Sequence, residues 1–86
     1  MKLVYHKRFL KRISLLSAKD RIKVEETLIL FEKNPFDQRL KNHELKGDMV
    51  GKRSISVRSD LRIIFEEFDG YVVVLLLNVG THNQVY

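Results

Sequence analysis

Apolar residues recur along this chain with two different spacings, and the spacing changes near the middle. Between residues 6 and 16, Phe9, Ile13 and Leu16 follow one another at intervals of four and three, which predicts an amphipathic helix. The same periodicity returns between residues 17 and 34, where a serine at the start can cap a second helix and an Asn-Pro pair ends it. Because the join between the two is short, they should form an antiparallel hairpin.

In the second half of the chain apolar and polar residues alternate, which is typical of strands. Residues 52–58 and 61–68 fit a strand and its return strand, joined by a tight Ser-Asp turn. An Asp-Gly pair at positions 69–70, the strongest hairpin signal in the chain, leads into residues 71–79. That last segment is apolar almost throughout, so we expect a strand buried on both faces in the middle of the sheet. Residues 1–5 predict a further short strand.

These elements give the order β-α-α-β-β-β in one domain over residues 1–86. The predicted fold class is α+β, with a two-helix hairpin packed on one face of an antiparallel sheet. The other face is left open, and we expect the polar side chains of the second and third strands, including Ser56, Arg58 and Arg62, to lie on it. Residues 84–86 are expected to form a last short strand or edge.

Composition narrows the possible partners and chemistry. Lysine and arginine total 16 against 11 acidic residues, a net charge of +5 that favours nucleic acid, an anionic membrane or an acidic protein as partner. The absence of cysteine excludes disulfides and thiolate metal sites. The three histidines are far apart and no carboxylates cluster at ligand spacing, so no metal and no cofactor is predicted. No apolar run could span a bilayer and no signal peptide is evident, so we expect a cytoplasmic protein.

The side chains that remain suit metal-free cleavage of RNA. The 2′-hydroxyl of the substrate is then the nucleophile, and the protein supplies a base for its proton, an acid for the leaving 5′-oxygen and cations for the phosphorane. Histidine suits the proton transfers because its ordinary pKa lies near neutrality. Arginine suits the phosphate because its planar fork can hold two oxygens.

Two stretches carry a resemblance to a known family. They are HELKGDMVGKRSISVRSDLRIIFEE, which begins at His43, and LLLNVGTHNQVY, which ends at Tyr86. Their most specific parts are H-x-L-x-G, D-x-R-I-I-F and V-G-T-H. Together with the size, the basic charge and the order of elements, these stretches resemble the RelE/ParE superfamily of bacterial toxins, and most closely its YafQ branch.

The resemblance implies the toxin of a type II toxin–antitoxin pair, a metal-independent endoribonuclease that cleaves mRNA on the ribosome. It also implies a cognate antitoxin as partner, in a toxin–antitoxin hetero-oligomer. By position, the catalytic residues would be His43, Asp60, Arg62 and His82. His43 and His82 would transfer protons, Asp60 would assist or orient, and Arg62 would stabilise the phosphorane.

A further set of residues is expected to bind RNA: Lys46, Lys52, Arg53, Arg58 and Tyr86. Arg58 would share the phosphate with Arg62, while the lysines and Arg53 would contact the RNA backbone. The terminal tyrosine could stack on a base. His6, by contrast, is interpreted as structural.

Two other functions stay open at this point. The same fold includes ParE-like toxins that inhibit DNA gyrase and are not nucleases. A catalytically inert member that binds only antitoxin or RNA is the third possibility, because Ser56 and Asn78 stand where the YafQ pattern has a histidine and an arginine. Histidines at both 43 and 82 favour the nuclease over the gyrase inhibitor.

Overall fold

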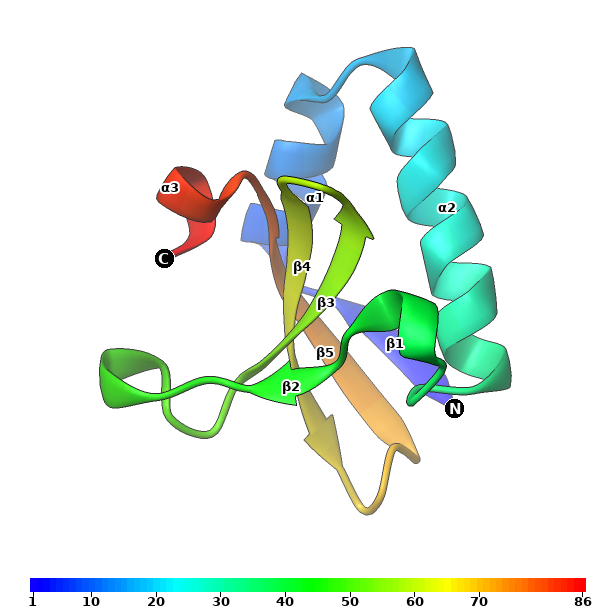
Figure 1. The fold of residues 1–86 in the computed structure, drawn as a ribbon, viewed down its shortest axis with the longest axis vertical. Helices are drawn as coiled ribbons and strands as arrows, with labels where there is room; N and C mark the ends of the chain where they lie inside the picture. Colours follow the sequence, from blue (N-terminus) through cyan, green and yellow to red (C-terminus); the bar gives the residue numbers. More distant parts are fainter.

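The computed structural model describes residues 1–86 as a five-stranded sheet with a pair of helices on one face (Figure 1). The strands are β1 (Lys2–Tyr5), β2 (His43–Glu44), β3 (Arg53–Arg58), β4 (Leu61–Phe68) and β5 (Val73–Gly80). The helices are α1 (Lys7–Leu15), α2 (Ala18–Lys33) and a short α3 (His82–Val85), and two 3₁₀ turns are η1 (Gln38–Leu40) and η2 (Gly47–Met49). In the sheet the strands are ordered β1-β5-β4-β3-β2.

The predicted α+β fold, with a helix hairpin on one face of a sheet, is confirmed. The prediction that the sheet is entirely antiparallel is wrong for one strand. Strands β5, β4, β3 and β2 pair antiparallel as expected. β1 instead runs parallel to β5, with Lys2 opposite Val73 and Tyr5 opposite Leu76, so the sheet is mixed. A parallel pair needs a long crossover connection, and here the rest of the fold lies between the two strands. The four residues of β1 carry no pattern that reveals this direction.

Both helices of the hairpin begin and end where local chemistry requires. The Ser17 side chain accepts a hydrogen bond from the Asp20 backbone N–H at 3.1 Å and so caps α2. The Asp20 carboxylate does not complete a capping box; it binds Arg58 of β3 instead. α2 ends at Asn34, since Pro35 cannot continue the helix. None of the helices is both long enough and apolar enough to cross a lipid bilayer.

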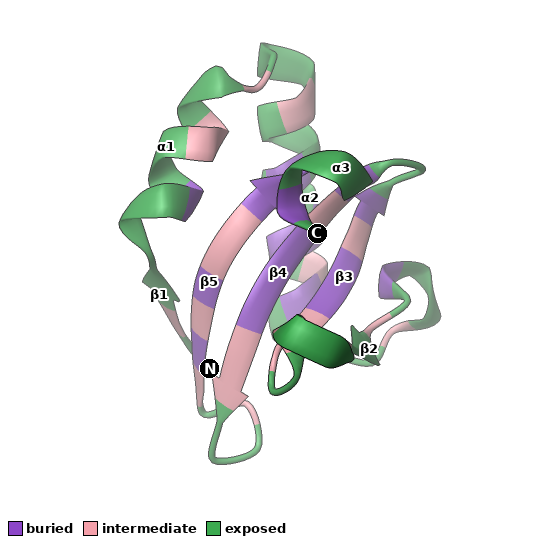
Figure 2. Ribbon diagram, turned by 90° about the vertical axis from the view of Figure 1, so that its left-hand side faces the viewer, coloured by how far each residue is buried: buried purple, intermediate pink, exposed green.

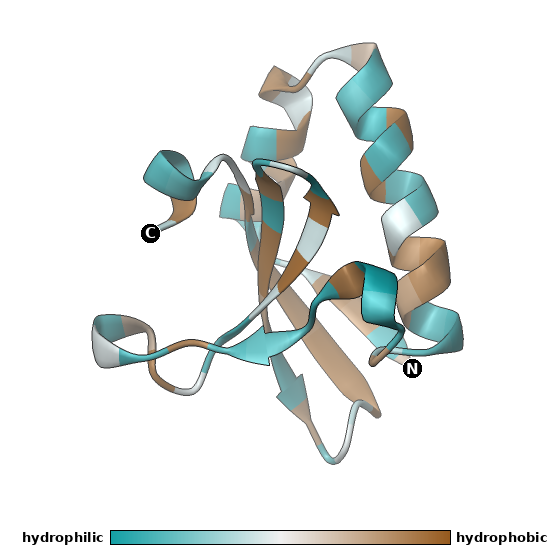
Figure 3. Cartoon of the chain, viewed as in Figure 1, coloured by the Kyte–Doolittle hydropathy of each residue, from teal (hydrophilic) through white to brown (hydrophobic).

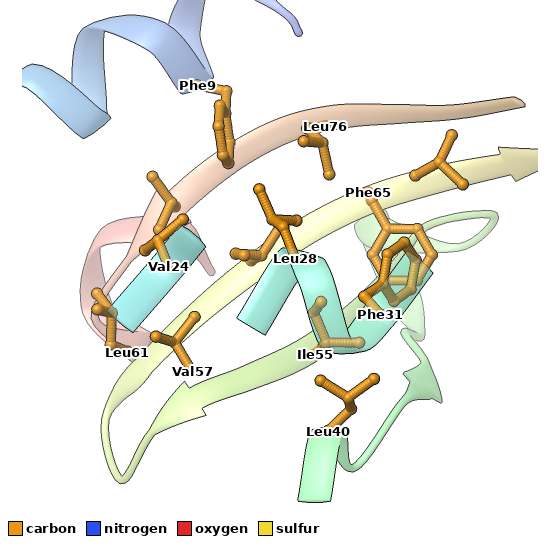
Figure 4. Packing of buried hydrophobic residues seen from close by; sticks show 13 residues of the cluster. Phe9, Val24, Leu28, Phe31, Leu40, Ile55, Val57, Leu61, Phe65 and Leu76 are labelled. Atoms are coloured by element: carbon orange, nitrogen blue, oxygen red, sulfur yellow. The ribbon is translucent and has the colours of Figure 1, made fainter. Parts of the chain in front are cut away.

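The core lies between α1, α2 and the helix-facing side of β3, β4 and β5 (Figure 4). Its centre is Phe31 of α2, which is fully buried and meets Phe65 of β4 edge-on, with ring centroids 5.0 Å apart. Figure 2 shows the buried residues running along these three strands. The other members of the cluster come from every layer: Phe9, Val24, Leu28, Leu40, Ile55, Val57, Leu61, Ile63, Val74, Leu76 and Val79.

The C-terminal part of the chain departs from two expectations. β5 forms an apolar band in Figure 3, and its helix-facing residues such as Val74 and Leu76 are buried. Leu75 and Leu77 on the other side are half-buried, so burial on both faces is not complete. After Gly80 the chain forms helix α3 and no last strand. Gln84 Oε1 accepts a hydrogen bond from the Thr81 N–H at 2.8 Å, which is half of a capping box and favours the helix.

Candidate active site

The candidate site lies on the open face, the side of the sheet opposite the α1–α2 hairpin. Residues that pair across the strands share a face, and two rows cross this one. The first row runs from His43 through Ser54 and Ile64 to Asn78, and the second from Ser56 through Arg62 to Gly80. α3 contacts β4 and β5 from this side, so that α2 and α3 lie on opposite sides of the sheet (Figure 1).

One end of the open face brings together three of the predicted residues. α3 carries His82, and its ring meets that of Tyr86 edge-on with centroids 4.6 Å apart; both side chains are exposed. Asp60, in the turn between β3 and β4, accepts a hydrogen bond at Oδ1 from the His82 backbone N–H at 3.3 Å. The aspartate therefore ties the hairpin tip to α3 and holds the histidine in place.

Arg62 of β4 lies in the second row, under the same end of the sheet. The side chain is half-buried, and its Nε is inaccessible to solvent yet has no hydrogen-bond partner. The buried Ser54 Oγ in the first row is unpaired in the same way. A buried polar group without a partner usually costs about 1–3 kcal/mol. Both unpaired groups of this kind belong to residues in the two rows of the open face.

His43 lies on the far side of the open face, in β2. Its Nδ1 is 2.9 Å from the carbonyl oxygen of Lys41. A carbonyl can only accept, so Nδ1 carries the proton and the neutral ring has its lone pair at Nε2. Lys41 holds its carbonyl there in a left-handed conformation with φ of 51°. His43 and Arg62 are two strand spacings apart across the sheet and lie in neighbouring rows, which corresponds to a backbone distance of about 12 Å.

The five expected RNA-binding residues divide between the two faces of the sheet. Lys52 is half-buried at the open face, and Lys46 is exposed just before η2. Arg58 is on the helix side, contrary to expectation: its Nε and Nη2 donate to Asp20 of α2 at 2.9 and 3.0 Å. The register of β3 shifts between Ser56 and Arg58, and such a bulge turns the next side chain to the other face. The Arg58 hydrogen bond lowers the pKa of Asp20, and the carboxylate raises the pKa of Arg58.

Arg53 also lies on the helix side. It is opposite Phe65 in the register, its Nε donates to Asn42 Oδ1 at 2.9 Å, and its guanidinium is 5.9 Å from the centre of the Phe36 ring. The guanidinium is thus held by a hydrogen bond and an aromatic face of the protein itself. No three side chains of the types that bind metals gather anywhere in the structure.

Sequence reasoning missed two residues of the open face, His6 and Arg8. They line a pocket of about 290 Å³ beside Asn78 and Lys52. His6 does have the expected structural role, since its Nδ1 accepts from the Arg8 backbone N–H at 3.0 Å and caps α1. Only the pairing of β1 with β5 brings these residues to the site, and no spacing in the sequence indicates that pairing.

Comparison with known proteins agrees with this architecture. The family model described as the bacterial toxin of a type II toxin–antitoxin system, YafQ, matches residues 1–86. YafQ from E. coli strain BL21(DE3) is 23% identical with a TM-score of 0.81, covering 99% of this chain and 97% of that one. A copper-bound mutant toxin from Helicobacter pylori is 27% identical with a TM-score of 0.80, covering 100% and 99%. The chain is also similar to a structure of the E. coli DinJ–YafQ complex, at 22% identity and a TM-score of 0.74, covering 99% and 97%.

The solved structures below 25% identity support the fold, and the family model extends over the whole chain. No curated protein matches. The match over residues 1–86 establishes that this chain belongs to the YafQ family of bacterial toxins from type II toxin–antitoxin systems.

Proposed function

We propose that this toxin is an endoribonuclease that cuts mRNA on the ribosome by attack of a substrate 2′-hydroxyl on the adjacent phosphorus. The observation that carries the proposal is the 2.9 Å contact between His43 Nδ1 and the Lys41 carbonyl oxygen. With its proton on Nδ1, bound to the Lys41 carbonyl, the ring offers an unprotonated Nε2 on the open face. That is the form a general base needs.

The reaction divides between the two sides of the open face. His43 Nε2 takes the proton of the 2′-hydroxyl, and the 2′-oxygen bonds to phosphorus. The bond from phosphorus to the 5′-oxygen breaks, and protonated His82 gives that oxygen its proton. The products are a 2′,3′-cyclic phosphate and a free 5′-hydroxyl, so protons and bonds balance without a further reactant.

Arg62 and the groups around α3 support this chemistry. The half-buried Arg62 side chain forms no ion pair within the protein, and its guanidinium donates to the phosphate oxygens as negative charge grows on them. Asp60 is a positioning residue, because it binds the backbone of His82 and not its ring. Tyr86 lies edge-on to His82 and offers a ring on which a neighbouring base can stack.

We also propose a cognate antitoxin as the partner that holds the toxin inactive, within a cytoplasmic toxin–antitoxin hetero-oligomer. The DinJ–YafQ complex is a structural relative of this chain. Between α1 and α2 lies an apolar groove that exposes Leu10 and Ile22 by 54% and 57%, with Tyr5 at one end. The net charge of +5 favours an acidic segment of the partner, which would order as its apolar side enters the groove.

Primer extension on a reporter mRNA, after inducible expression in a bacterial host, tests the nuclease. We expect breaks at defined positions within translated codons, and their loss in the double variant His43→Ala, His82→Ala. Both side chains are exposed, so this variant should fold normally and still co-purify with the antitoxin. Growth arrest with intact mRNA would overturn the proposed nuclease activity. Breaks that persist in the double variant would overturn the assignment of these two histidines as catalytic residues.

A further inference from the structure

The pocket beside Asn78 is formed by parts of the chain that are distant in sequence. His6 and Arg8 come from the start of α1, Lys52 from the segment before β3, and Val85 from α3. The pocket opens on the same face as the proposed catalytic residues, yet none of those residues lines it. Its volume of about 290 Å³ leaves room for a planar ring of the size of a nucleobase.

The floor of the pocket is apolar. Ile64 and Val85 are 1% and 7% exposed, and Leu77 beside them is half-buried. One polar group lies next to this surface, the side chain of Asn78. Its Oδ1 accepts from the Val79 N–H at 2.9 Å, while its Nδ2 has no partner in the protein. An apolar surface with one free donor beside it suits the face and edge of a base.

The rim of the pocket is cationic. Arg8 and Lys52 form no ion pair, and their side chains donate no hydrogen bond within the protein. The His6 Nδ1 accepts from the Arg8 N–H, so the neutral ring carries its proton on Nε2 and has a donor to offer. No acidic residue lines the pocket. Three groups of this kind around an uncharged floor favour a phosphate.

We propose that this pocket binds one nucleotide of single-stranded RNA next to the cleaved bond. The base lies against Ile64, Leu77 and Val85, and Asn78 Nδ2 donates to its edge. The phosphate lies between Arg8 and Lys52, and His6 donates to it. This subsite rests on the proposed function, because the same RNA strand continues across the open face to the phosphate held by Arg62.

Binding of a short RNA oligonucleotide to the full chain tests the subsite. The oligonucleotide carries 2′-O-methyl groups throughout, which block the attacking oxygen and separate binding from cleavage. We expect the double variant Arg8→Gln, Lys52→Gln to bind about 10-fold more weakly at physiological salt. The slope of log K against log salt should fall by about 0.7 for each phosphate that the variant no longer neutralises. The side-chain amide resonances of Asn78 should shift with RNA in the wild type and shift less in the variant.

Lys23→Gln is the matched control, since Lys23 is an exposed cation of α2 on the other side of the sheet (Figure 1). It should keep the wild-type affinity and salt slope. Suppose that the wild type cleaves mRNA and binds the oligonucleotide, and that the double variant binds it with the same affinity and salt slope. The proposed subsite is then wrong, while the proposed nuclease activity is unaffected. A wild type that neither cleaves mRNA nor binds the oligonucleotide overturns both.

Discussion

Substitution of Gly80 by alanine tests how closely α3 packs against the end of β5. It lies at the end of β5, in the same row as Arg62. A Cβ built there would be 2.7 Å from Gln84 Oε1, 3.0 Å from Gln84 Cβ and 3.2 Å from Arg12 Nη2. Rotation of the Gln84 side chain relieves the contact with Oε1, but the contact with Gln84 Cβ requires α3 to shift by a few tenths of an ångström.

The cost of that displacement has two parts, a broken hydrogen bond and a crowded methyl group. Gln84 Oε1 accepts from the Thr81 N–H at 2.8 Å, and removing such a cap costs about 1 kcal/mol. Crowding by an added methyl group in a packed site costs about 1–3 kcal/mol more. We therefore expect Gly80→Ala to lower the free energy of unfolding by about 2–4 kcal/mol. In a domain of this size that lowers Tm by about 10–30 °C.

Thermal unfolding followed by circular dichroism measures this destabilisation, and primer extension on a reporter mRNA measures its effect on cleavage. Because His82 moves with α3, cleavage should fall by about 3- to 10-fold, since a misplacement of about 1 Å can cost about 100-fold. Gln84→Ala is the control: it removes the cap without the added carbon, so it should cost only about 1 kcal/mol and leave α3 in place. A Gly80→Ala protein with wild-type Tm and wild-type cleavage would refute the packing of α3 against β5.

Three further outcomes follow from interactions elsewhere in the fold. Phe31→Ala empties the centre of the core and should cost about 3–5 kcal/mol in a urea titration; a cost below about 1 kcal/mol would contradict the packing against Phe65. Arg58→Gln should leave mRNA cleavage within about 2-fold of wild type, because its guanidinium binds Asp20 on the helix side; a drop of about 100-fold would return it to the active site. Arg39 lowers the pKa of Asp37 from 3.8 to about 2, so the stabilisation by this pair is complete above pH 3.8 and lost as the pH falls through 2. Across that window the free energy of unfolding of Asp37→Asn should change less than that of the wild type, and identical pH profiles would contradict the ion pair.

The parts of the fold that the sequence predicts correctly are those with a local signal. The helix hairpin follows from the spacing of Phe9, Ile13 and Leu16 and from the serine cap, and the Asp-Gly turn predicts the hairpin between β4 and β5. The parallel pairing of β1 has no local signal, because its partner lies at the other end of the chain. The helix at residues 82–85 does have a local signal, since Thr81 and Gln84 have the spacing of a capping box.

In the candidate site, too, only some of the residue positions can be predicted from the sequence. That His82, Tyr86 and Asp60 lie together could be anticipated from their places at the ends of strands and turns. The face of Arg58 could not, because strict alternation puts it with Ser56, and a bulge between them reverses the order. The position of Arg8 depends on the strand that precedes it, so it too is invisible to periodicity.

The parallel pairing of β1 with β5 has a consequence for synthesis of the toxin. Lys2 leaves the ribosome long before its partner Val73, because 70 residues lie between them in the sequence. The sheet cannot close, and α3 cannot be seated, until the chain has been made past β5, since contacts so distant in sequence form late. A nascent chain that has not yet exposed β5 therefore lacks the pocket that His6, Arg8 and Asn78 line and the contact between Asp60 and His82. The candidate site is complete only after β5 and α3 have both been made.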